Sequence, residues 1–303
     1  MSHELTDLLG LAGRTALVTG AGSGIARATA HRLADAGCDV AVVDLDVAAA
    51  ERTVAEMTAK GRKAVAVQAD VTNPAAPAAM VRRAVEALGP ISVAVNVAGG
   101  TAGVNKSFLD LTLDEWHRPM ALNLDSTFLS VQAEAIAMVR AGLPGTIVNV
   151  GSTSGVTGAP NLSPYGAANA GVIHFTKTAA LELAPYRIRV NCLIPGTHWT
   201  TGTRAHMNNP EAPTSVREFF AKSAAATPLG DLGEPEQTAG VALFLASNLS
   251  SYVTGTSVVS DGGILHTTAR PAFGGGTVPE AIRDHVDADR SPRAASPTKK
   301  ERP

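Results

Sequence analysis

The residues best suited to chemistry are a serine and a tyrosine thirteen positions apart. Ser152 lies in the segment Gly-Ser-Thr-Ser, and Tyr165 follows Ser163 and Pro164. A serine hydroxyl can orient a substrate carbonyl or hydroxyl, and a tyrosine hydroxyl can move a proton to or from it. A free tyrosine has a pKa near ~10, so it needs help to act as a base at neutral pH. The pair therefore predicts acid–base chemistry on an oxygen-bearing small molecule.

A glycine-rich turn follows the first predicted strand. It contains Gly20, Ser23, Gly24 and Ile25, and a helical stretch begins within it. Glycines let the backbone approach a pyrophosphate, and the start of the helix presents free N–H groups and a positive dipole to the anion. A glycine pattern alone is weak evidence, but between a strand and a helix it is typical of dinucleotide binding. A purely structural turn is the alternative.

Asp44 predicts which dinucleotide the turn would hold. It ends the second predicted strand, twenty residues after Gly24. A carboxylate there can accept hydrogen bonds from the ribose hydroxyls of NAD and would repel the 2′-phosphate of NADP. Ser23 and Leu45, its neighbours, carry no positive charge, so NAD is favoured over NADP. The alternative is that Asp44 caps a helix, although Asp46 is as well placed for that role.

These residues must be held by elements that alternate along the chain. Strands are predicted at residues 15–18, 39–43, 64–68, 91–95, 146–150, 188–192 and 257–259, and helices at 24–37, 46–60, 75–88, 112–140, 163–184 and 235–247. Alternation of this kind predicts parallel pairing through right-handed crossovers. The fold class is therefore α/β, a doubly wound, Rossmann-like, seven-stranded parallel sheet flanked by helices in a single domain.

Three further segments complete the predicted organisation. Residues 1–10 form an N-terminal arm, and residues 11–265 the dinucleotide-binding domain. Within it, residues 197–227 are polar and interrupted by prolines, as substrate lids often are. The lid carries His198, Trp199, His206, Met207, Phe219 and Phe220, which suits a bulky, partly apolar substrate. His198, just after the Pro195–Gly196 turn, is also a candidate auxiliary proton carrier because an imidazole has a near-neutral pKa. Residues 266–303 have too little apolar surface to fold and are predicted to be disordered.

Taken in order, these motifs resemble the short-chain dehydrogenase/reductase family over about residues 11–265. The glycine turn is similar to its TGxxxGxG motif, with Ala26 at the last glycine position. The resemblance implies further cofactor contacts from Asp70 and Val71, from the NxAG-like turn Asn96, Ala98 and Gly99, which also steadies the sheet, and from the PGxxxT-like turn Pro195, Gly196 and Thr200. Asp70 could equally cap the next helix, and Asn96 could be a purely structural turn residue. It also implies that Asn123 takes part in a proton relay, that Tyr165 is the acid/base and that Ser152 orients the substrate.

Asn169 departs from the family pattern. The family has a lysine four residues after the tyrosine, and this chain has asparagine. A unit charge roughly 6 Å from the phenolate is worth about 2–3 kcal/mol at an effective dielectric near 20, or about two pKa units. Asn169 can still hold a ribose hydroxyl but lacks that charge. Three readings follow: an attenuated NAD(H)-dependent alcohol/ketone oxidoreductase, a non-redox enzyme (elimination, isomerisation or addition), or a catalytically silent nucleotide-binding protein.

The composition of the chain limits which partners, cellular location and metal sites are to be expected. The 303 residues include 45% hydrophobic and 17% charged residues, with a formal net charge of −2, which argues against nucleic-acid or membrane-surface partners. The apolar runs are too short to span a bilayer. Cys38 and Cys192 are predicted to be reduced core thiols of a cytoplasmic protein, and the eight histidines show no spacing for a metal. The family resemblance implies a homotetramer or homodimer.

Overall fold

Seven parallel strands form one sheet among the residues that the computed structural model describes, which are 8–209, 211 and 213–267. The strands are Thr15–Thr19 (β1), Asp39–Asp44 (β2), Ala64–Gln68 (β3), Ile91–Asn96 (β4), Gly145–Val150 (β5), Ile188–Pro195 (β6) and Ser257–Ser260 (β7). Their order is β3-β2-β1-β4-β5-β6-β7. The order reverses between β1 and β4, which is where doubly wound sheets bind their ligands. The predicted fold class is confirmed.

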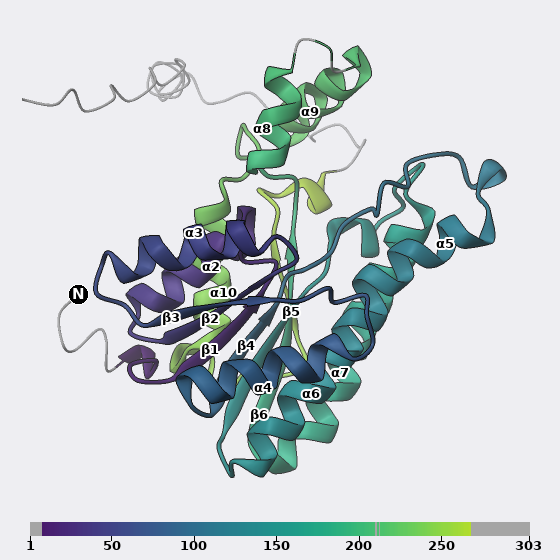
Figure 1. Ribbon diagram of the computed structural model, residues 1–303. Coiled ribbons are helices and arrows are strands. Elements are labelled where there is room, and N and C mark those ends of the chain that lie inside the picture. The colour runs from purple at the N-terminus through teal and green to yellow at the C-terminus, as the bar shows by residue number, and fades with distance from the viewer. Residues whose placement is uncertain (1–7, 210, 212, 268–303) are drawn as a thin grey trace, which may run out of the picture. The chain divides into compact units, whose positions relative to one another are not determined.

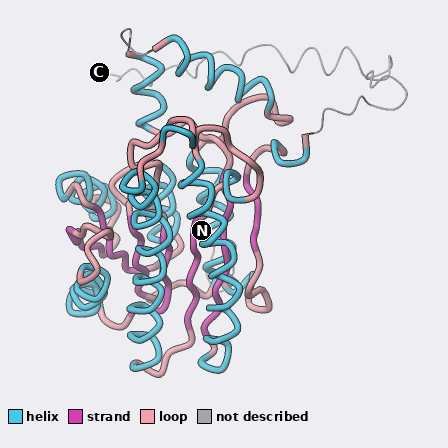
Figure 2. Tube along the Cα trace, turned by 90° about the vertical axis from the view of Figure 1, so that its right-hand side faces the viewer, coloured by secondary structure: helices cyan, strands magenta, loops and turns pink. Residues whose placement is uncertain are grey.

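Helices cover both faces of this sheet. They are Gly24–Asp35 (α2), Val47–Thr58 (α3), Ala76–Leu88 (α4), Leu113–Pro119 (α5), Ser126–Arg140 (α6), Ser163–Leu183 (α7), Thr201–Asn208 (α8), Thr214–Ala226 (α9) and Pro235–Ala246 (α10). Short helices lie at Phe108–Asp110, Met120–Asp125, Thr153–Gly155, Ala184–Tyr186, Asn248–Ser250 and Ile264–His266. Figure 1 shows α2, α3 and α10 on one face and α4, α6 and α7 on the other, and Figure 2 shows the same layers from the side.

The core is divided in two by the sheet because successive strand residues point to opposite faces. Ala16 and Val18 of β1 pack in the cluster that includes α2 and α10, and Leu17 between them packs in the cluster that includes α4 and α6. Strands covered on both faces are expected to be apolar throughout. All five residues of β1 are buried, in agreement with that expectation.

The helix predicted at 112–140 is interrupted. The segment Met120–Asp125 is a π-helix that begins directly after Pro119. Proline has no N–H to donate and clashes with the preceding turn, so an α-helix does not continue regularly through it. Asn123 fills the irregular turn, since its side-chain amide donates to the Pro119 carbonyl at 2.7 Å. The sequence reasoning overlooked Pro119 as the signal for this break.

The chain termini meet the predictions only in part. Leu9, which the predicted arm contained, is buried in the core, so ordered packing begins before residue 11. The described residues up to Leu265 form one compact unit. Residues 1–7 and 268–303 lie outside the described residues, and with them most of the predicted arm and tail. No helix among those described is long and apolar enough to cross a membrane.

Candidate active site

A crevice opens at the carboxyl ends of β1, β2 and β4. It encloses about 440 Å³ and brings together ten of the predicted cofactor residues. These are Gly20, Ser23, Gly24, Ile25, Asp44, Asp70, Val71, Ala98, Gly99 and Thr200. Segments far apart in the sequence thus converge on one site, as the resemblance implied.

The glycine turn is shaped by close approach of neighbouring backbone. Gly20 has φ +72, and a Cβ there would stand 3.2 Å from the Ala98 Cα. At Gly22 a Cβ would lie 2.7 Å from the Ala49 Cβ and 2.8 Å from an Asp44 carboxylate oxygen. A side chain at Gly22 would collide with its surroundings, and one at Gly20 would need both a left-handed backbone and a small shift of Ala98. The turn therefore keeps its backbone bare at the mouth of α2, where an anion would bind.

The electrostatic character of the crevice is acidic. Asp44 accepts hydrogen bonds from the backbone N–H of Gly22 at 2.8 Å and of Asp46 at 3.0 Å. The residues that line the crevice include the carboxylates of Asp44 and Asp70 and no lysine, arginine or histidine. Hydrogen bonds from Thr72 lower the pKa of Asp70. The helix cap is supplied by Asp46, which accepts from the Ala49 N–H at 3.1 Å, so Asp44 is not the cap of α3.

The loop after β4 is held by Asn123. Its side chain accepts from the Gly100 N–H at 3.0 Å and donates to the Gly100 carbonyl at 2.8 Å. A Cβ at Gly99 would lie 2.6 Å from the Asn123 side-chain oxygen, which explains the glycine. Since the Asn123 amide is engaged with backbone, its geometry favours a role in fixing this loop. The relay role implied by the resemblance stays a prediction.

Asn96 corrects one prediction. Its side chain does not line the crevice; it is buried and donates to Glu134 at 3.0 Å and to Asn149 at 3.1 Å. Asn96 and Asn149 are register partners on β4 and β5. As the last residue of β4, Asn96 points toward α6, away from the cofactor side. Its side chain therefore steadies the sheet.

Ser152 and Tyr165 are brought together by two glycines that the sequence reasoning did not single out. A Cβ at Gly155 would lie 2.7 Å from the Asn169 carbonyl carbon, and one at Gly166 would lie 2.8 Å from the Ser154 carbonyl oxygen. The helix Thr153–Gly155 therefore packs directly on the backbone of α7. The available signal was a glycine three residues after the serine and another directly after the tyrosine.

Tyr165 lies in an uncharged environment. Burial raises its pKa, and hydrogen bonding with the side chains of Ser152 and Asn169 offsets part of the rise. Ser152 is 8% exposed and its hydroxyl also accepts from the Ser154 N–H at 3.1 Å. Asn169 is 2% exposed and donates to the Tyr165 carbonyl at 2.9 Å. The phenol therefore ionises less readily than that of a free tyrosine.

No nearby lysine replaces the missing charge among the candidates in the sequence. Lys106 forms an ion pair with Glu115 at 2.7 Å. Lys177 is exposed on α7, two turns beyond Asn169. Both observations agree with the expectation that solvated lysines pair at the surface.

The end of β6 places Thr200 against the glycine turn. Pro195 ends the strand, and a Cβ at Gly196 would lie 2.8 Å from the Asp261 Cα. Thr200 caps α8 by accepting from the Thr203 N–H at 3.1 Å, and its methyl carbon would lie 3.5 Å from a Cβ at Gly24. Pro195 and Gly196 do not line the crevice themselves. Pro195 and Gly196 instead form the turn that leads the chain from β6 to Thr200, which lines the crevice.

His198 does not have the freedom of a proton carrier. One ring nitrogen is hydrogen-bonded to the Gly196 carbonyl at 2.8 Å and the other to the Thr238 hydroxyl at 2.6 Å. Burial lowers its pKa. A Cβ at Gly233 would collide with the ring, 2.6 Å from Nε2. The residue joins the lid to α10, so we discard the hypothesis that it assists proton transfer.

The predicted lid consists of α8 and α9, which Figure 1 shows beyond the carboxyl ends of the strands. Trp199 donates to Asp231 at 3.0 Å and packs near Phe220, with ring centroids 6.4 Å apart. Phe220 also meets Phe219 edge-on at 5.3 Å. Phe220 thus docks α9, whereas Phe219 remains 56% exposed and available to a ligand. The His206 side chain lies outside the described residues.

Comparison with known proteins agrees with this geometry. The sequence model of the family described as enoyl-(acyl carrier protein) reductase matches residues 20–265. The chain is 40% identical over 257 residues to a human (3R)-3-hydroxyacyl-CoA dehydrogenase, covering 82% of this chain and 94% of the relative. It is 40% identical over 250 residues to a cyclohexanol dehydrogenase from Acinetobacter sp. (strain SE19), with the same coverage, 82% and 94%.

A solved structure shows the same likeness. The crystal structure of a short-chain type dehydrogenase/reductase from Mycobacterium marinum superposes with a TM-score of 0.76 at 37% identity. The match covers 87% of this chain and 99% of that one. The fold, the sequence motifs and the similar proteins therefore all indicate relatedness to dehydrogenases and reductases.

Proposed function

The chain belongs to the short-chain dehydrogenase/reductase family, and from that premise we propose that it is an NAD(H)-dependent enzyme that interconverts a secondary alcohol and a ketone. Oxidoreductase activity on alcohols is the common property of its relatives. One observation carries the proposal: the half-buried Tyr165 lies beside Ser152 and Asn169, whose side chains offset part of the rise that burial causes in its pKa. These side chains lie at the carboxyl ends of the strands, as does the glycine turn.

The crevice fits a nicotinamide dinucleotide. Gly20 and Gly22 leave the turn too crowded for any Cβ, as a pyrophosphate cradle requires. Asp44 would accept the adenosine ribose hydroxyls, and the lack of a cation in the crevice lining supports NAD over NADP. Asn169 would hold the other ribose, and Thr200 the nicotinamide amide. When bound, the cofactor supplies or receives the hydride.

Proton transfer falls to Tyr165. In ketone reduction its neutral phenol donates a proton to the substrate oxygen, which Ser152 orients by donating a hydrogen bond. In alcohol oxidation the phenolate must form first. Because burial raises the pKa of Tyr165 above its usual value, the phenolate forms less readily than in a free tyrosine. The site therefore favours reduction at neutral pH.

The substrate that we propose is bulky and partly apolar. A second cavity of about 470 Å³ lies beside the Ser152–Tyr165 region and is lined by small residues such as Gly158, Ala159 and Gly166. Exposed Phe219 on the lid adds apolar surface. The relatives named for cyclohexanol and for hydroxyacyl-CoA illustrate this range of alcohols.

A homo-oligomer and a cytoplasmic location remain part of the proposal, the latter supported by two free buried cysteines.

Calorimetric titration with NADH and with NADPH tests the cofactor assignment. We expect NADH to bind at least tenfold more tightly, since each interaction with a charged group is worth about 1.5–3 kcal/mol. Asp44→Ser should lower the NADH affinity and narrow the gap between the two cofactors. Asp46→Ser is the matched control, because it removes a neighbouring carboxylate and keeps a hydroxyl to cap α3.

The same titration separates the rival functions. If neither dinucleotide binds, the oxidoreductase is abandoned and a non-redox enzyme on this scaffold becomes the better hypothesis. If NADH binds but a panel of cyclic and acyl ketones is never reduced, the chain is a silent nucleotide-binding protein.

A further inference from the structure

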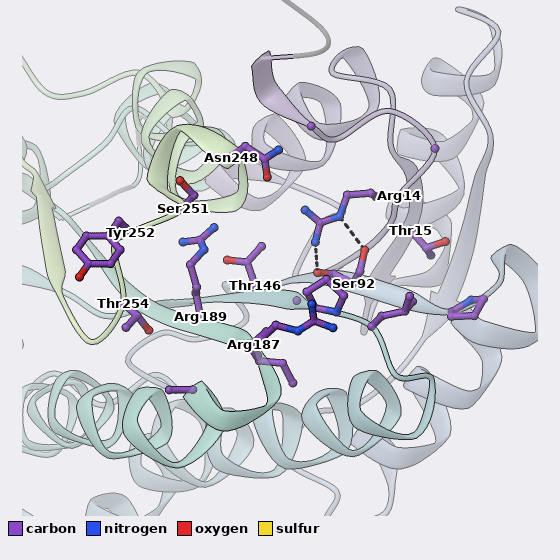
Figure 3. Close-up of a pocket in the computed structure, with 18 of the residues that line it drawn as sticks. Arg14, Thr15, Ser92, Thr146, Arg187, Arg189, Asn248, Ser251, Tyr252 and Thr254 are labelled. Atoms are coloured by element: carbon purple, nitrogen blue, oxygen red, sulfur yellow. Dashed lines mark hydrogen bonds between the residues drawn. The ribbon is translucent and has the colours of Figure 1, made fainter.

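A further cavity among the described residues lies at the opposite end of the strands from the crevice. It measures about 960 Å³ and is bordered by the amino ends of β1, β5 and β6. The segment from Asn248 to Thr254 closes its other side. Figure 3 shows polar side chains from all of these segments directed into one space. None of the predicted cofactor or catalytic residues borders it.

Three arginines define the charge of this cavity. They are Arg14, Arg187 and Arg189, and the residues lining the cavity include no aspartate or glutamate. None of the three forms an ion pair with another described residue. An uncompensated cluster of guanidinium groups in a concave site is unusual, because charged side chains are normally paired when they are partly buried.

Two of the arginines are held in place by hydrogen bonds. Arg14 donates to the Ser92 hydroxyl at 2.9 Å and to the Ser92 carbonyl at 2.7 Å. Arg189 donates to the carbonyls of Val253 at 3.0 Å, Leu245 at 3.0 Å and Ser247 at 3.2 Å. All these acceptors are neutral, so they orient the side chains without cancelling their charge. The cations are therefore fixed before any ligand arrives.

The fixed arginines repel one another. Burial, together with the charge of Arg14, lowers the pKa of Arg189 to about 10, and burial lowers the pKa of Arg14. An anion between them would relieve the repulsion. Arg187 is exposed and forms no hydrogen bond to another described residue through its side chain. Figure 3 shows its side chain below Ser92, bordering the same space as Arg14 and Arg189. It is free to close on a ligand.

The wall of the cavity also has an apolar part. Leu88, Pro90, Leu143 and Pro144 contribute to it. A bare inorganic anion would leave this surface and most of the volume unused. Guanidinium groups match the geometry of phosphate oxygens through paired N–H donors. From this juxtaposition we propose that the amino edge of the sheet binds a phosphorylated small organic molecule, with its phosphate held by Arg14, Arg187 and Arg189.

Calorimetry with phenyl phosphate and with inorganic phosphate tests this site. We expect phenyl phosphate to bind more tightly than inorganic phosphate, because it also covers the apolar wall, and its affinity to fall as salt rises. Phenyl phosphate should also raise the melting temperature of the protein. Arg187→Gln should weaken binding about tenfold, as expected when one charge-assisted contact is lost. Arg187 is chosen for substitution because its side chain forms no hydrogen bond or ion pair with another described residue, so the fold should tolerate the change.

Arg83→Gln is the matched control, since Arg83 is an exposed arginine on α4 outside the cavity. It should leave the affinity unchanged. The glycine turn could also attract phosphate, but binding there would survive Arg187→Gln. Binding of phenyl phosphate that is equal in the wild type and in Arg187→Gln overturns the proposal, as does the absence of binding to the wild type. Neither result depends on whether NADH binds.

Discussion

Tyr165 and Asn169 together define the chemistry at the scale of single residues. Tyr165 is half-buried, its pKa is raised by burial, and the neighbour one helical turn away is an amide that donates to the Tyr165 carbonyl. An amide can orient the phenol but cannot favour the phenolate by charge. In the proposed function, this residue pair speeds the direction in which tyrosine gives a proton to the substrate more than the reverse direction.

Asn169→Lys tests this directly. A lysine ammonium group roughly 6 Å from the phenolate should lower the pKa of Tyr165 by about two units. Alcohol oxidation at pH 7 should rise at least tenfold, and its pH–rate profile should move to lower pH. Reduction should change little, since the phenol is already protonated. Steady-state rates of both directions between pH 6 and pH 10 provide the measurement.

Thr178→Lys serves as the control for Asn169→Lys, because it places the same charge on the exposed side of α7. It should leave the profile where it was. A loss of all activity in Asn169→Lys, with cofactor binding retained, would mean that asparagine belongs to a different reaction.

The sequence predicted the role of a residue correctly where that role depends on the local backbone alone. The crowding at Gly20 and Gly22 and the place of Asp44 at a strand end follow from local sequence. The direction of Asn96 does not, because it depends on a buried glutamate on another element. The prediction that His198 carries protons was wrong for the same reason, since its hydrogen-bond partner Thr238 lies forty residues away in the sequence.

At the scale of elements, the packing of α6 on β4 and β5 contains a buried carboxyl group. Glu134 of α6 is 0% exposed and accepts from Asn96 at 3.0 Å. Its other oxygen and the Asn96 oxygen have no hydrogen-bond partner among the described residues. Burial raises the pKa of Glu134 to about 7. Protonation would turn one oxygen of Glu134 into a hydroxyl donor, which the carboxylate lacks.

The stability of the protein should therefore fall as pH rises. Between pH 4.5, the ordinary pKa of glutamate, and about 7, the unfolded chain loses this proton while the folded protein keeps it. The free energy of unfolding should drop by about 3 kcal/mol over that interval from this group alone. Glu134→Gln should remove the drop and be the more stable form at pH 8, as measured by urea unfolding at pH 5 and pH 8.

Glu182→Gln gives the matched control, since Glu182 is exposed on α7. Its stability should follow the wild type at both pH values. A Glu134→Gln variant that keeps the full pH dependence would assign the effect to other groups.

Element prediction succeeded where periodicity was clear. All seven strands lie where β-branched segments predicted them, and β6 extends three residues further than expected. The interruption at Met120–Asp125 was missed because the apolar pattern continues through Pro119 while the hydrogen bonding does not. The contact of Gly155 and Gly166 between a short helix and α7 involves no periodic signal at all.

At the scale of the whole molecule, the sheet offers a different surface at each end of its strands. The carboxyl edge holds an acidic crevice, and the amino edge holds three arginines. Residues at the carboxyl ends of strands were predicted to converge, and they do. The same reasoning applied to Arg14 and Arg187, which directly precede strands, would have revealed the second cluster. It was missed because no motif draws attention to strand beginnings.

The two cysteines of the chain have a practical consequence. Cys38 and Cys192 are buried in the core, and burial raises their pKa to about 12 and about 11. Maleimide reagents attack thiolates, so the folded native protein should resist alkylation, and both thiols should react once it is unfolded. A cysteine introduced at exposed Ser215 on α9 should then be the sole site of rapid modification. A fluorophore placed there would report whether α9 moves when dinucleotide is added, with no need to remove a native residue.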